Sequence, residues 1–391
     1  MRKIALFLIL LIFIIGCVQQ EEIQTIAEPE QIEEKDALEQ MPESVLQELC
    51  QKESWPSDCS MIPDTKGREL CEKCKELGVG EKKIGTIKPT DITQLTFLDD
   101  LVGDPDWSPD GSKLVFLGLE KNLMKGGLYI MNNDGTGLTK IAGQWGRDNL
   151  FNPSWNPVNN KIISHGSGGG QGPGGKGLFL VDLDGDQTKR VQLTPQIVEH
   201  VSWNHDGKKI AYNVYEEYDS SSNNYKSSSI WLMNADGTGK IQLTANEDGF
   251  CTGPSFSYDG SKIVYLKGFT TTMPGEKPEK AINEIWIMNN DGTNKHRIYA
   301  PGDGMQLIRE RAWNKDNKII FTRHLRQRAP QIWIINSDGT NLKLIFDPEE
   351  EGIPTAIYDD PVWDNTGTKI AVTKVILSDE SWQIATFSWK E

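Results

Sequence analysis

Short apolar runs separated by turn residues recur along most of this 391-residue chain. The runs are rich in β-branched and aromatic residues and are bounded by Gly, Asn, Asp or Pro, which is typical of β-strands. One motif opens six successive units, at spacings of 48, 48, 53, 57 and 50 residues: WSPDGSKLVF at 107, WNPVNNKIIS at 155, WNHDGKKIAY at 203, FSYDGSKIVY at 256, WNKDNKIIF at 313 and WDNTGTKIAV at 363. The pattern predicts a repeat protein made of strands.

Each unit reads as four strands, which we name A to D in chain order. Strand A ends at the aromatic residue of the opening motif, and strand B follows its turn. Strand C precedes an Asp-Gly turn in the first five units, as in LYIMNNDGT and IWIMNNDGT, and strand D is a run such as VQLT at 191–194. Tryptophans recur in register, which favours packing between units. Four strands at this spacing are typical of a propeller blade, so the sequence predicts an all-β, six-bladed β-propeller over residues 91–391.

The sixth unit ends without a strand D, because the chain stops soon after QIATF at 383–387. A matching run, ITQLTF at 92–97, precedes the first strand A and resembles the strands D of other units. We therefore expect this N-terminal strand to complete the last blade and close the ring. Closure removes the open sheet edges that invite aggregation.

The two motifs together resemble the WD40-like propeller repeats of the Tol-B type. The resemblance rests on WSPDG followed by a K-[IL] strand and then IWIMNxDGT, and it covers residues 91–391. The second unit departs from the pattern, with NPVNN in place of SPDG, and the sixth lacks the turn between strands C and D. The resemblance implies the propeller fold. It does not carry over the partners of Tol-B, whose N-terminal domain is unlike the cysteine-rich segment of this chain.

The N-terminal residues predict export and membrane anchoring. Residues 1–16 read as a lipoprotein signal peptide, since an apolar run at 4–15 follows Arg2-Lys3 and leads to Gly16-Cys17. In that reading Cys17 carries the lipid; the alternative is an ordinary signal peptide with an incidental cysteine. Both place the mature protein outside the cytoplasm. Residues 17–44 are rich in Glu and Gln, which predicts a flexible tether.

Residues 45–80 predict a small cysteine-rich helical hairpin. It contains Cys50, Cys59, Cys71 and Cys74, the last two on one face of an expected helix. A hairpin of this size lacks a sufficient core, so we expect two disulfides in an oxidising compartment. Four cysteines allow three pairings, and the spacing of Cys71 and Cys74 leaves a zinc site as an alternative.

The aspartate of WSPDG is predicted to serve a turn rather than chemistry. Its position holds different residue types in the six units: Asp110, Val158, Asp206, Asp259, Asp316 and Thr366. Valine neither transfers a proton nor binds a metal, so catalysis is not the shared role. The flanking positions hold small polar residues and Gly or Asn, which suit a tight turn.

Functional residues are expected on one face of the disc. The A–B and C–D turns are tight and lie on the same side, which we call the tight-turn face. The B–C and D–A connections are longer and differ between units, and they define the opposite loop face, where binding is usually built. Solvated loops without a partner are the alternative. Three residues before each aromatic residue of strand A, a polar rim is predicted at the channel mouth: Asp104, Asn152, His200, Glu310 and Asp360, with Gly253 in the fourth unit.

A basic cluster lies in the fifth unit of this acidic chain. Its members are Arg309, Arg311, Arg323, His324, Arg326 and Arg328. Clustered guanidinium groups favour an anion or carboxylate site. Local pairing with Glu310 or with residues 349–351 is the alternative.

These features predict a lipid-anchored binding or scaffolding module of the cell envelope. Its partner would be an envelope protein, a peptide or a glycan, whereas a net charge of -15 argues against nucleic acid. We expect no enzyme, because the chain has no G-x-S-x-G motif and no hydrolase domain. We also expect no cofactor and no bound metal. The alternative is a polysaccharide lyase or hydrolase-like propeller that works at the channel mouth, with His200 and His165 as the best-placed metal ligands.

Overall fold

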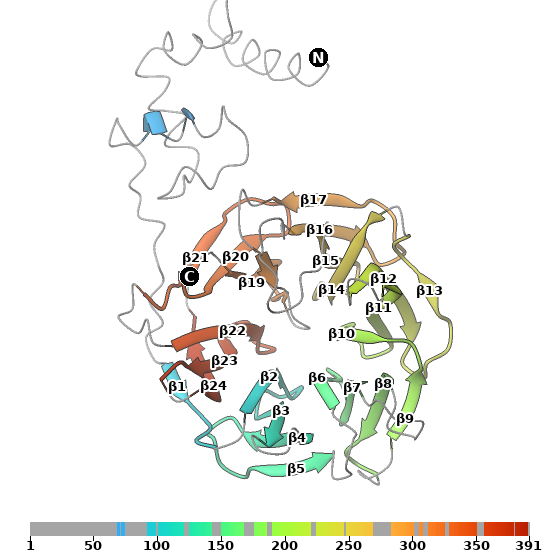
Figure 1. The fold of residues 1–391 in the computed structure, drawn as a ribbon, viewed down its shortest axis with the longest axis vertical. Coiled ribbons are helices and arrows are strands. Elements are labelled where there is room, and N and C mark those ends of the chain that lie inside the picture. Colours follow the sequence, from blue (N-terminus) through green and yellow to red (C-terminus); the bar gives the residue numbers. More distant parts are fainter. Residues whose placement is uncertain are drawn as a thin grey trace, which may run out of the picture. The chain divides into compact units, whose positions relative to one another are not determined.

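Six four-stranded antiparallel sheets stand around a central axis in the computed structural model (Figure 1). This confirms the all-β, six-bladed propeller. The structure describes residues 69–70, 72–74, 92–98, 101–120, 125–142, 150–167, 176–185, 190–219, 224–245, 248–268, 283–300, 305–307, 312–324, 328–349, 356–378 and 380–389.

The first three blades follow one another along the chain. Blade 1 contains β2 (Leu101–Trp107), β3 (Lys113–Glu120), β4 (Lys125–Asn132) and β5 (Thr139–Ala142). Blade 2 contains β6 (Leu150–Trp155), β7 (Lys161–Ser167), β8 (Lys176–Asp182) and β9 (Arg190–Thr194). Blade 3 contains β10 (Val198–Trp203), β11 (Lys209–Asp219), β12 (Asn224–Asn234) and β13 (Ile241–Gln242).

The last three blades repeat this order, with one exception in the sixth. Blade 4 contains β14 (Phe250–Phe256), β15 (Lys262–Gly268), β16 (Asn283–Asn289) and β17 (His296–Tyr299). Blade 5 contains β18 (Met305–Leu307), β19 (Lys318–His324), β20 (Gln331–Asn336) and β21 (Lys343–Phe346). Blade 6 contains β22 (Ala356–Trp363), β23 (Lys369–Ile376), β24 (Ser381–Ser388) and the N-terminal β1 (Ile92–Gln94).

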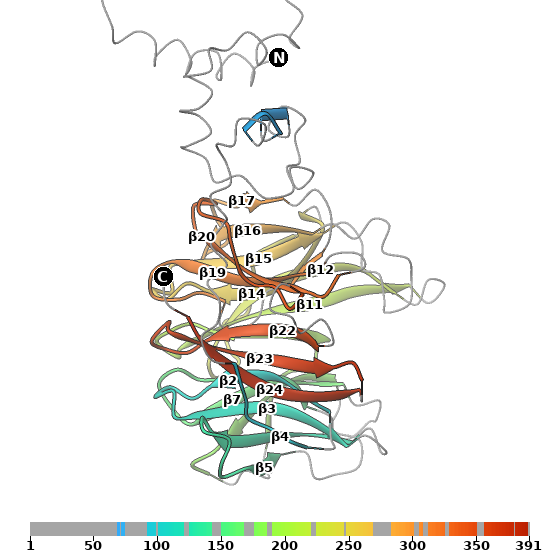
Figure 2. The ribbon, with the colours of Figure 1, turned by 90° about the vertical axis from the view of Figure 1, so that its left-hand side faces the viewer.

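Within each blade, strand A lies innermost and strand D outermost (Figure 1). Viewed from the side, the strands run roughly along the axis of the ring, from one face of the disc to the other (Figure 2). Turns and loops are thereby confined to the two faces. Strand A of each blade therefore borders the centre of the ring, where a site shared by several blades has to be built.

The outer strand of blade 6 comes from the other end of the chain. β1 pairs antiparallel with β24, with Ile92 opposite Phe387 and Gln94 opposite Ala385. Beyond the paired residues, Thr96 Oγ1 accepts a hydrogen bond of 2.8 Å from the Ile384 amide. The threonine of the QLT run in blade 3 has the same role, since Thr244 Oγ1 accepts from the Ile230 amide at 2.8 Å.

The tryptophans of strand A join neighbouring blades. The indole Nε1 of Trp203 donates to the carbonyl of Ser154 in blade 2 at 3.1 Å, and Trp313 Nε1 donates to Ser255 O in blade 4 at 3.1 Å. Apolar clusters also cross the blade boundaries: Trp107 packs in one cluster with Val362 of blade 6. The core therefore lies between the blades, as the repeated tryptophans predict.

The turn role of Asp110 is confirmed by its contacts. Its Oδ1 accepts hydrogen bonds from Ser108 Oγ at 2.7 Å and from the Ser112 amide at 3.0 Å. These bonds stabilise the carboxylate and lower the pKa of Asp110 from 3.8 to about 2. Gly111 follows with φ of 69°, a conformation that glycine adopts without strain.

Most of the predictions for the N-terminal region lie outside the described residues. These are the signal peptide at 1–16, the lipid-bearing Cys17, the tether at 17–44 and three of the cysteines: Cys50, Cys59 and Cys71. Residues 69–70 and 72–74 are helical, and Cys74 is fully buried. Within the described part of the chain, no helix has the length and apolar character needed to cross a membrane.

Candidate functional site

The predicted polar rim coincides with an irregularity in strand A. The pairing of strands A and B shifts register there, for example between Gly103 and Asp106 and between Asp359 and Val362. The residue three before the aromatic position has a positive φ in four blades: Asp104 at 53°, Asn152 at 44°, Gly253 at 60° and Asp360 at 54°. Asp, Asn and Gly tolerate the left-handed conformation best. The backbone conformation therefore favours these residue types independently of the binding role predicted for the rim.

On one side of the axis, a threonine connects two rim residues of neighbouring blades. Thr373 Oγ1 on β23 donates to Asp360 Oδ2 at 3.0 Å and accepts from the Asp104 amide at 3.1 Å. Asp360 is 7% exposed, so its carboxylate needs such a donor. The contact fixes the rim where blade 6 meets blade 1.

A second group connects blades 2 and 3. Asn152 Nδ2 donates to the carbonyl of Glu199 at 2.9 Å and lies 3.5 Å from His200 Nδ1. The His200 amide donates to Asn213 Oδ1 of β11 at 2.7 Å. The ring nitrogen His200 Nε2 is 3.9 Å from a carboxylate oxygen of Glu199. We define the channel mouth by the two groups and one further acid: Asp104, Asn152, Glu199, His200, Asp359 and Asp360.

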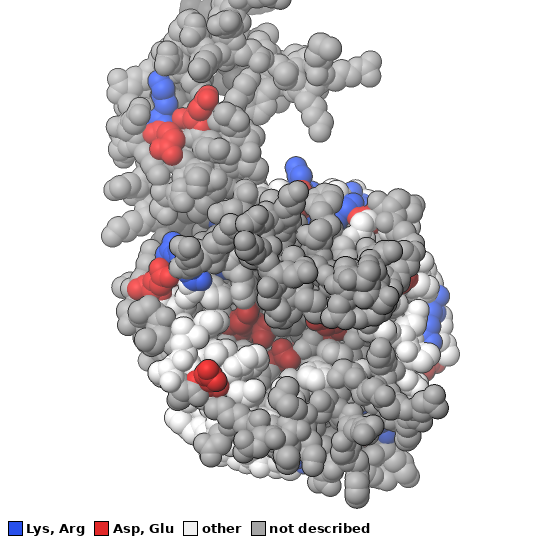
Figure 3. Space-filling view, in the orientation of Figure 1, with Lys and Arg blue, Asp and Glu red and all other residues white. Residues whose placement is uncertain are grey.

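Acidic side chains gather in the middle of the ring in the space-filling view (Figure 3). The channel mouth accounts for four carboxylates, those of Asp104, Glu199, Asp359 and Asp360. The side chain of Glu199 is 44% exposed and so is accessible to a partner. The site therefore offers acceptors and negative charge.

A histidine–carboxylate pair joins blades 5 and 6 beside the mouth. His324 Nε2 at the end of β19 is 3.0 Å from Asp359 Oδ2 on β22. Their side chains are 29% and 18% exposed, respectively. The two side chains are therefore within ion-pairing distance of each other.

The rest of the predicted basic cluster does not form one site among the described residues. Arg323 is fully buried, with its guanidinium 6.0 Å from the ring centroid of Trp333. Arg328 forms ion pairs with Asp347 at 3.0 Å and with Glu349 at 3.2 Å. Its charge is thus engaged locally. Three members, Arg309, Arg311 and Arg326, lie outside the described residues, as does Glu310 of the rim.

Several residues of this site were missed from the sequence. Thr373 and Asn213 belong to strand B, and Glu199 and Asp359 each precede the rim position that was singled out. One signal was present: Asn213, Thr322 and Thr373 are polar residues at the same position of an otherwise apolar strand B. No group of three or more His, Cys, Asp or Glu side chains able to hold a metal occurs in the described part of the chain.

Comparison with known proteins gives distant similarities. No family model matches the chain. An uncharacterized peptidase, YuxL, of Bacillus subtilis (strain 168) is 26% identical over 186 residues, which are 47% of this chain and 24% of that protein. The chain thus matches about a quarter of the length of this relative.

Solved structures with a similar fold include an oligogalacturonate lyase in complex with manganese. It is 13% identical, with 77% of this chain and 93% of that chain covered and a TM-score of 0.51. A putative TolB from Agrobacterium tumefaciens is 16% identical, with 77% and 97% covered and a TM-score of 0.49. At such identities the likeness concerns the fold alone.

These similarities correct one expectation. The chain was expected not to be an enzyme, because it lacks a G-x-S-x-G motif. A protein named as a peptidase is similar in sequence, and a lyase has the same fold. Neither the propeller nor the missing motif therefore excludes catalysis.

Proposed function

We propose that this protein is a lipid-anchored, extracytoplasmic β-propeller that binds an envelope protein, a peptide or a glycan at the channel mouth. The lipid would be attached at Cys17, and residues 17–44 would act as the tether. The observation that carries the proposal is the construction of the mouth. Polar residues there are joined between neighbouring blades by hydrogen bonds, blade 6 with blade 1 and blade 2 with blade 3.

Two further observations support parts of this proposal. Cys74 is disulfide-bonded, in keeping with a compartment outside the cytoplasm. The pairing of β1 with β24 supports closure of the ring by the N-terminal strand. A closed ring holds strands A of different blades in fixed register, which is what a site shared by several blades requires.

The proposal is tested by neutralising the mouth without altering its backbone. Asp104→Asn keeps a residue that tolerates the left-handed conformation, and Glu199→Gln keeps side-chain size. The matched control carries Asp206→Asn and Asp236→Asn, which remove two exposed carboxylates from the tight-turn face. All three proteins are expressed as full chains, extracted from membranes with their bound partners, and compared by quantitative mass spectrometry.

The proposal predicts that the mouth variant loses a co-purifying partner or glycan that the control retains. Equal recovery of every associated component from all three proteins would overturn the mouth as the binding site. Melting temperatures close to that of the wild type establish that any loss is local.

Catalysis at the same mouth is a second candidate, favoured by the pair His324 and Asp359. A histidine 3.0 Å from a carboxylate at a channel mouth is a candidate general base. Oligogalacturonate and unstructured peptides are the first substrates to try, since similar proteins are named for a lyase and a peptidase. Cleavage by the wild type that is abolished in His324→Gln would support an enzyme. Wild-type cleavage that persists in His324→Gln, or no cleavage of either substrate, would count against this catalytic site.

A further inference from the structure

A second pocket lies on the tight-turn face, opposite the loop face. Its wall consists of aromatic side chains that end strand A in five blades: Trp155, Trp203, Phe256, Trp313 and Trp363. The space it contains is about 530 Å³, its open mouth included.

The mouth of this pocket is formed by the residue two positions after the aromatic residue in blades 2 to 6: Pro157, His205, Tyr258, Lys315 and Asn365. The corresponding residue of blade 1 is Pro109. The neighbouring turn positions hold similar residues in every blade, because the turn requires them. This position is unconstrained by the turn and differs in chemistry around the ring. Aromatic rings in blades 3 and 4 are followed by the ammonium group of Lys315 in blade 5 and by Asn365 in blade 6, whose side chain donates to the carbonyl of Pro109.

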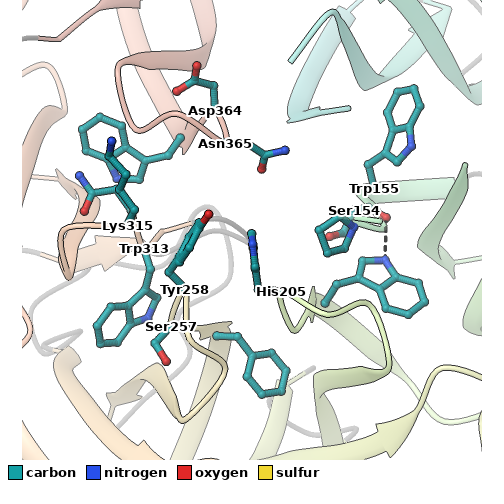
Figure 4. Close-up of a pocket in the computed structure, with 14 residues that line it drawn as sticks. Ser154, Trp155, His205, Ser257, Tyr258, Trp313, Lys315, Asp364 and Asn365 are labelled. Atoms are coloured by element: carbon teal, nitrogen blue, oxygen red, sulfur yellow. Dashed lines mark hydrogen bonds between the residues drawn. The ribbon is translucent and has the colours of Figure 1, made fainter. Parts of the chain in front are cut away.

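The aromatic part is the ring pair of His205 and Tyr258. Their ring centroids are 4.0 Å apart, and the Tyr258 side chain remains 40% exposed. Both rings lie in the central space of the pocket, and Asn365 points toward it from the adjoining turn (Figure 4). An exposed flat ring at this place offers a stacking surface.

The polar part carries positive charge. Lys315 is exposed and has no ion pair with any described residue. The nearby carboxylate of Asp364 is taken up by its own turn, where Oδ1 accepts the amides of Thr368 at 2.9 Å and Lys369 at 3.0 Å, and Oδ2 accepts the Thr366 hydroxyl at 2.6 Å. The pocket therefore presents an ammonium group whose charge the protein leaves available.

Two buried donors point to the same ligand chemistry. Asn314 Nδ2 and Trp363 Nε1 both belong to residues that line the pocket, and neither has an acceptor among the described residues. Asn314 is 2% exposed and Trp363 1% exposed. A wall with surplus N–H donors favours a ligand rich in acceptor oxygens.

We propose that this axial pocket binds a small carboxylic acid that carries an aromatic ring. The carboxylate accepts from Lys315 Nζ, and the ring lies against Tyr258. The inference is independent of the channel mouth, which lies on the other face.

The test uses phenylacetate and its neutral counterpart phenylacetamide, titrated into the full-length protein by isothermal calorimetry. The wild type is expected to bind phenylacetate at least tenfold more tightly than the amide, because only the acid pairs with the ammonium group. Lys315→Met should remove that difference, and Lys315→Arg should retain it. The matched control is Lys208→Met, since Lys208 lies in the corresponding turn of blade 3 with a side chain 79% exposed.

A further variant examines the stacking surface. Tyr258→Ala should weaken phenylacetate binding severalfold while leaving the melting temperature close to that of the wild type. The proposal is overturned if phenylacetate does not bind, if acid and amide bind equally, or if Lys208→Met weakens binding as much as Lys315→Met. The mouth variant, which combines Asp104→Asn and Glu199→Gln, should bind phenylacetate as the wild type does. This result distinguishes failure of the axial pocket from failure of the channel mouth.

Discussion

Gln383→Leu is the substitution that most directly tests how the N-terminal strand is held in the ring. Gln383 lies on β24 with only 3% of its surface exposed. Its Oε1 accepts from Thr96 Oγ1 at 2.7 Å and from the Leu98 amide at 3.2 Å, and its Nε2 donates to Leu98 O at 2.8 Å. One side chain thus fixes the residues that follow β1.

The expected loss of stability follows from these contacts. Leucine has a similar volume, so packing is largely kept while three hydrogen bonds disappear. At about 0.5–1.5 kcal/mol for each bond, the variant should lose roughly 3 kcal/mol of unfolding free energy. For a ring of this size, that corresponds to a melting temperature lower by roughly 5–10 °C.

The assay is urea unfolding followed by circular dichroism, together with amide hydrogen exchange of residues 92–98. Gln242→Leu is the matched control, because Gln242 is an exposed residue in the outer strand of blade 3. The control should change stability by less than about 0.5 kcal/mol. Exchange in Gln383→Leu should increase first in β1 and its partner β24. An unfolding midpoint for Gln383→Leu that equals that of the control would refute closure through these contacts.

Three further outcomes are expected. Asp110→Asn should lower the melting temperature slightly at pH 7 and by much less at pH 2, because a carboxylate with pKa of about 2 contributes full stability above its ordinary pKa of 3.8 and loses it as the pH falls through about 2. Trp203→Phe should lower the free energy of urea unfolding by about 1–2 kcal/mol, because the 3.1 Å hydrogen bond from the indole to Ser154 O is lost and this buried carbonyl is left without a donor. Cys251 should resist iodoacetamide in the folded protein at pH 8, as peptide mapping would show, because burial raises the pKa of its thiol to about 11.

The fold was predictable because each strand carries a local signal. Turn residues after the repeated aromatic position, with apolar alternation on either side, specify where strands A and B begin and end. The repeat spacing then limits the architecture to a ring of blades. These signals are local and occur six times. The repeat can therefore be recognised even where one copy differs from the motif, as where Val158 replaces the aspartate.

The candidate site was predictable only in part. The polarity at Asp104 and Asn152 was interpreted as functional, although the left-handed backbone there also favours these residue types. Thr373 lies on a different strand, far from Asp104 in the chain, and its contact depends on how two blades meet. The axial pocket around Lys315 was missed because the WSPDG-type turns had been assigned a structural role alone. The residue two positions after the aromatic residue varies between blades, and the pocket depends on this residue and not on the constrained turn positions.

The central claim is that the channel mouth on the loop face contacts the partner in the envelope. The most direct measurement places the photo-cross-linker p-benzoylphenylalanine at Glu199 in one protein and at Asp236, on the tight-turn face, in another. Both proteins are irradiated in intact cells and the adducts are identified by mass spectrometry. The account predicts a specific adduct from position 199 and none from position 236. An adduct from position 236 alone, or the same adducts from both positions, would contradict it.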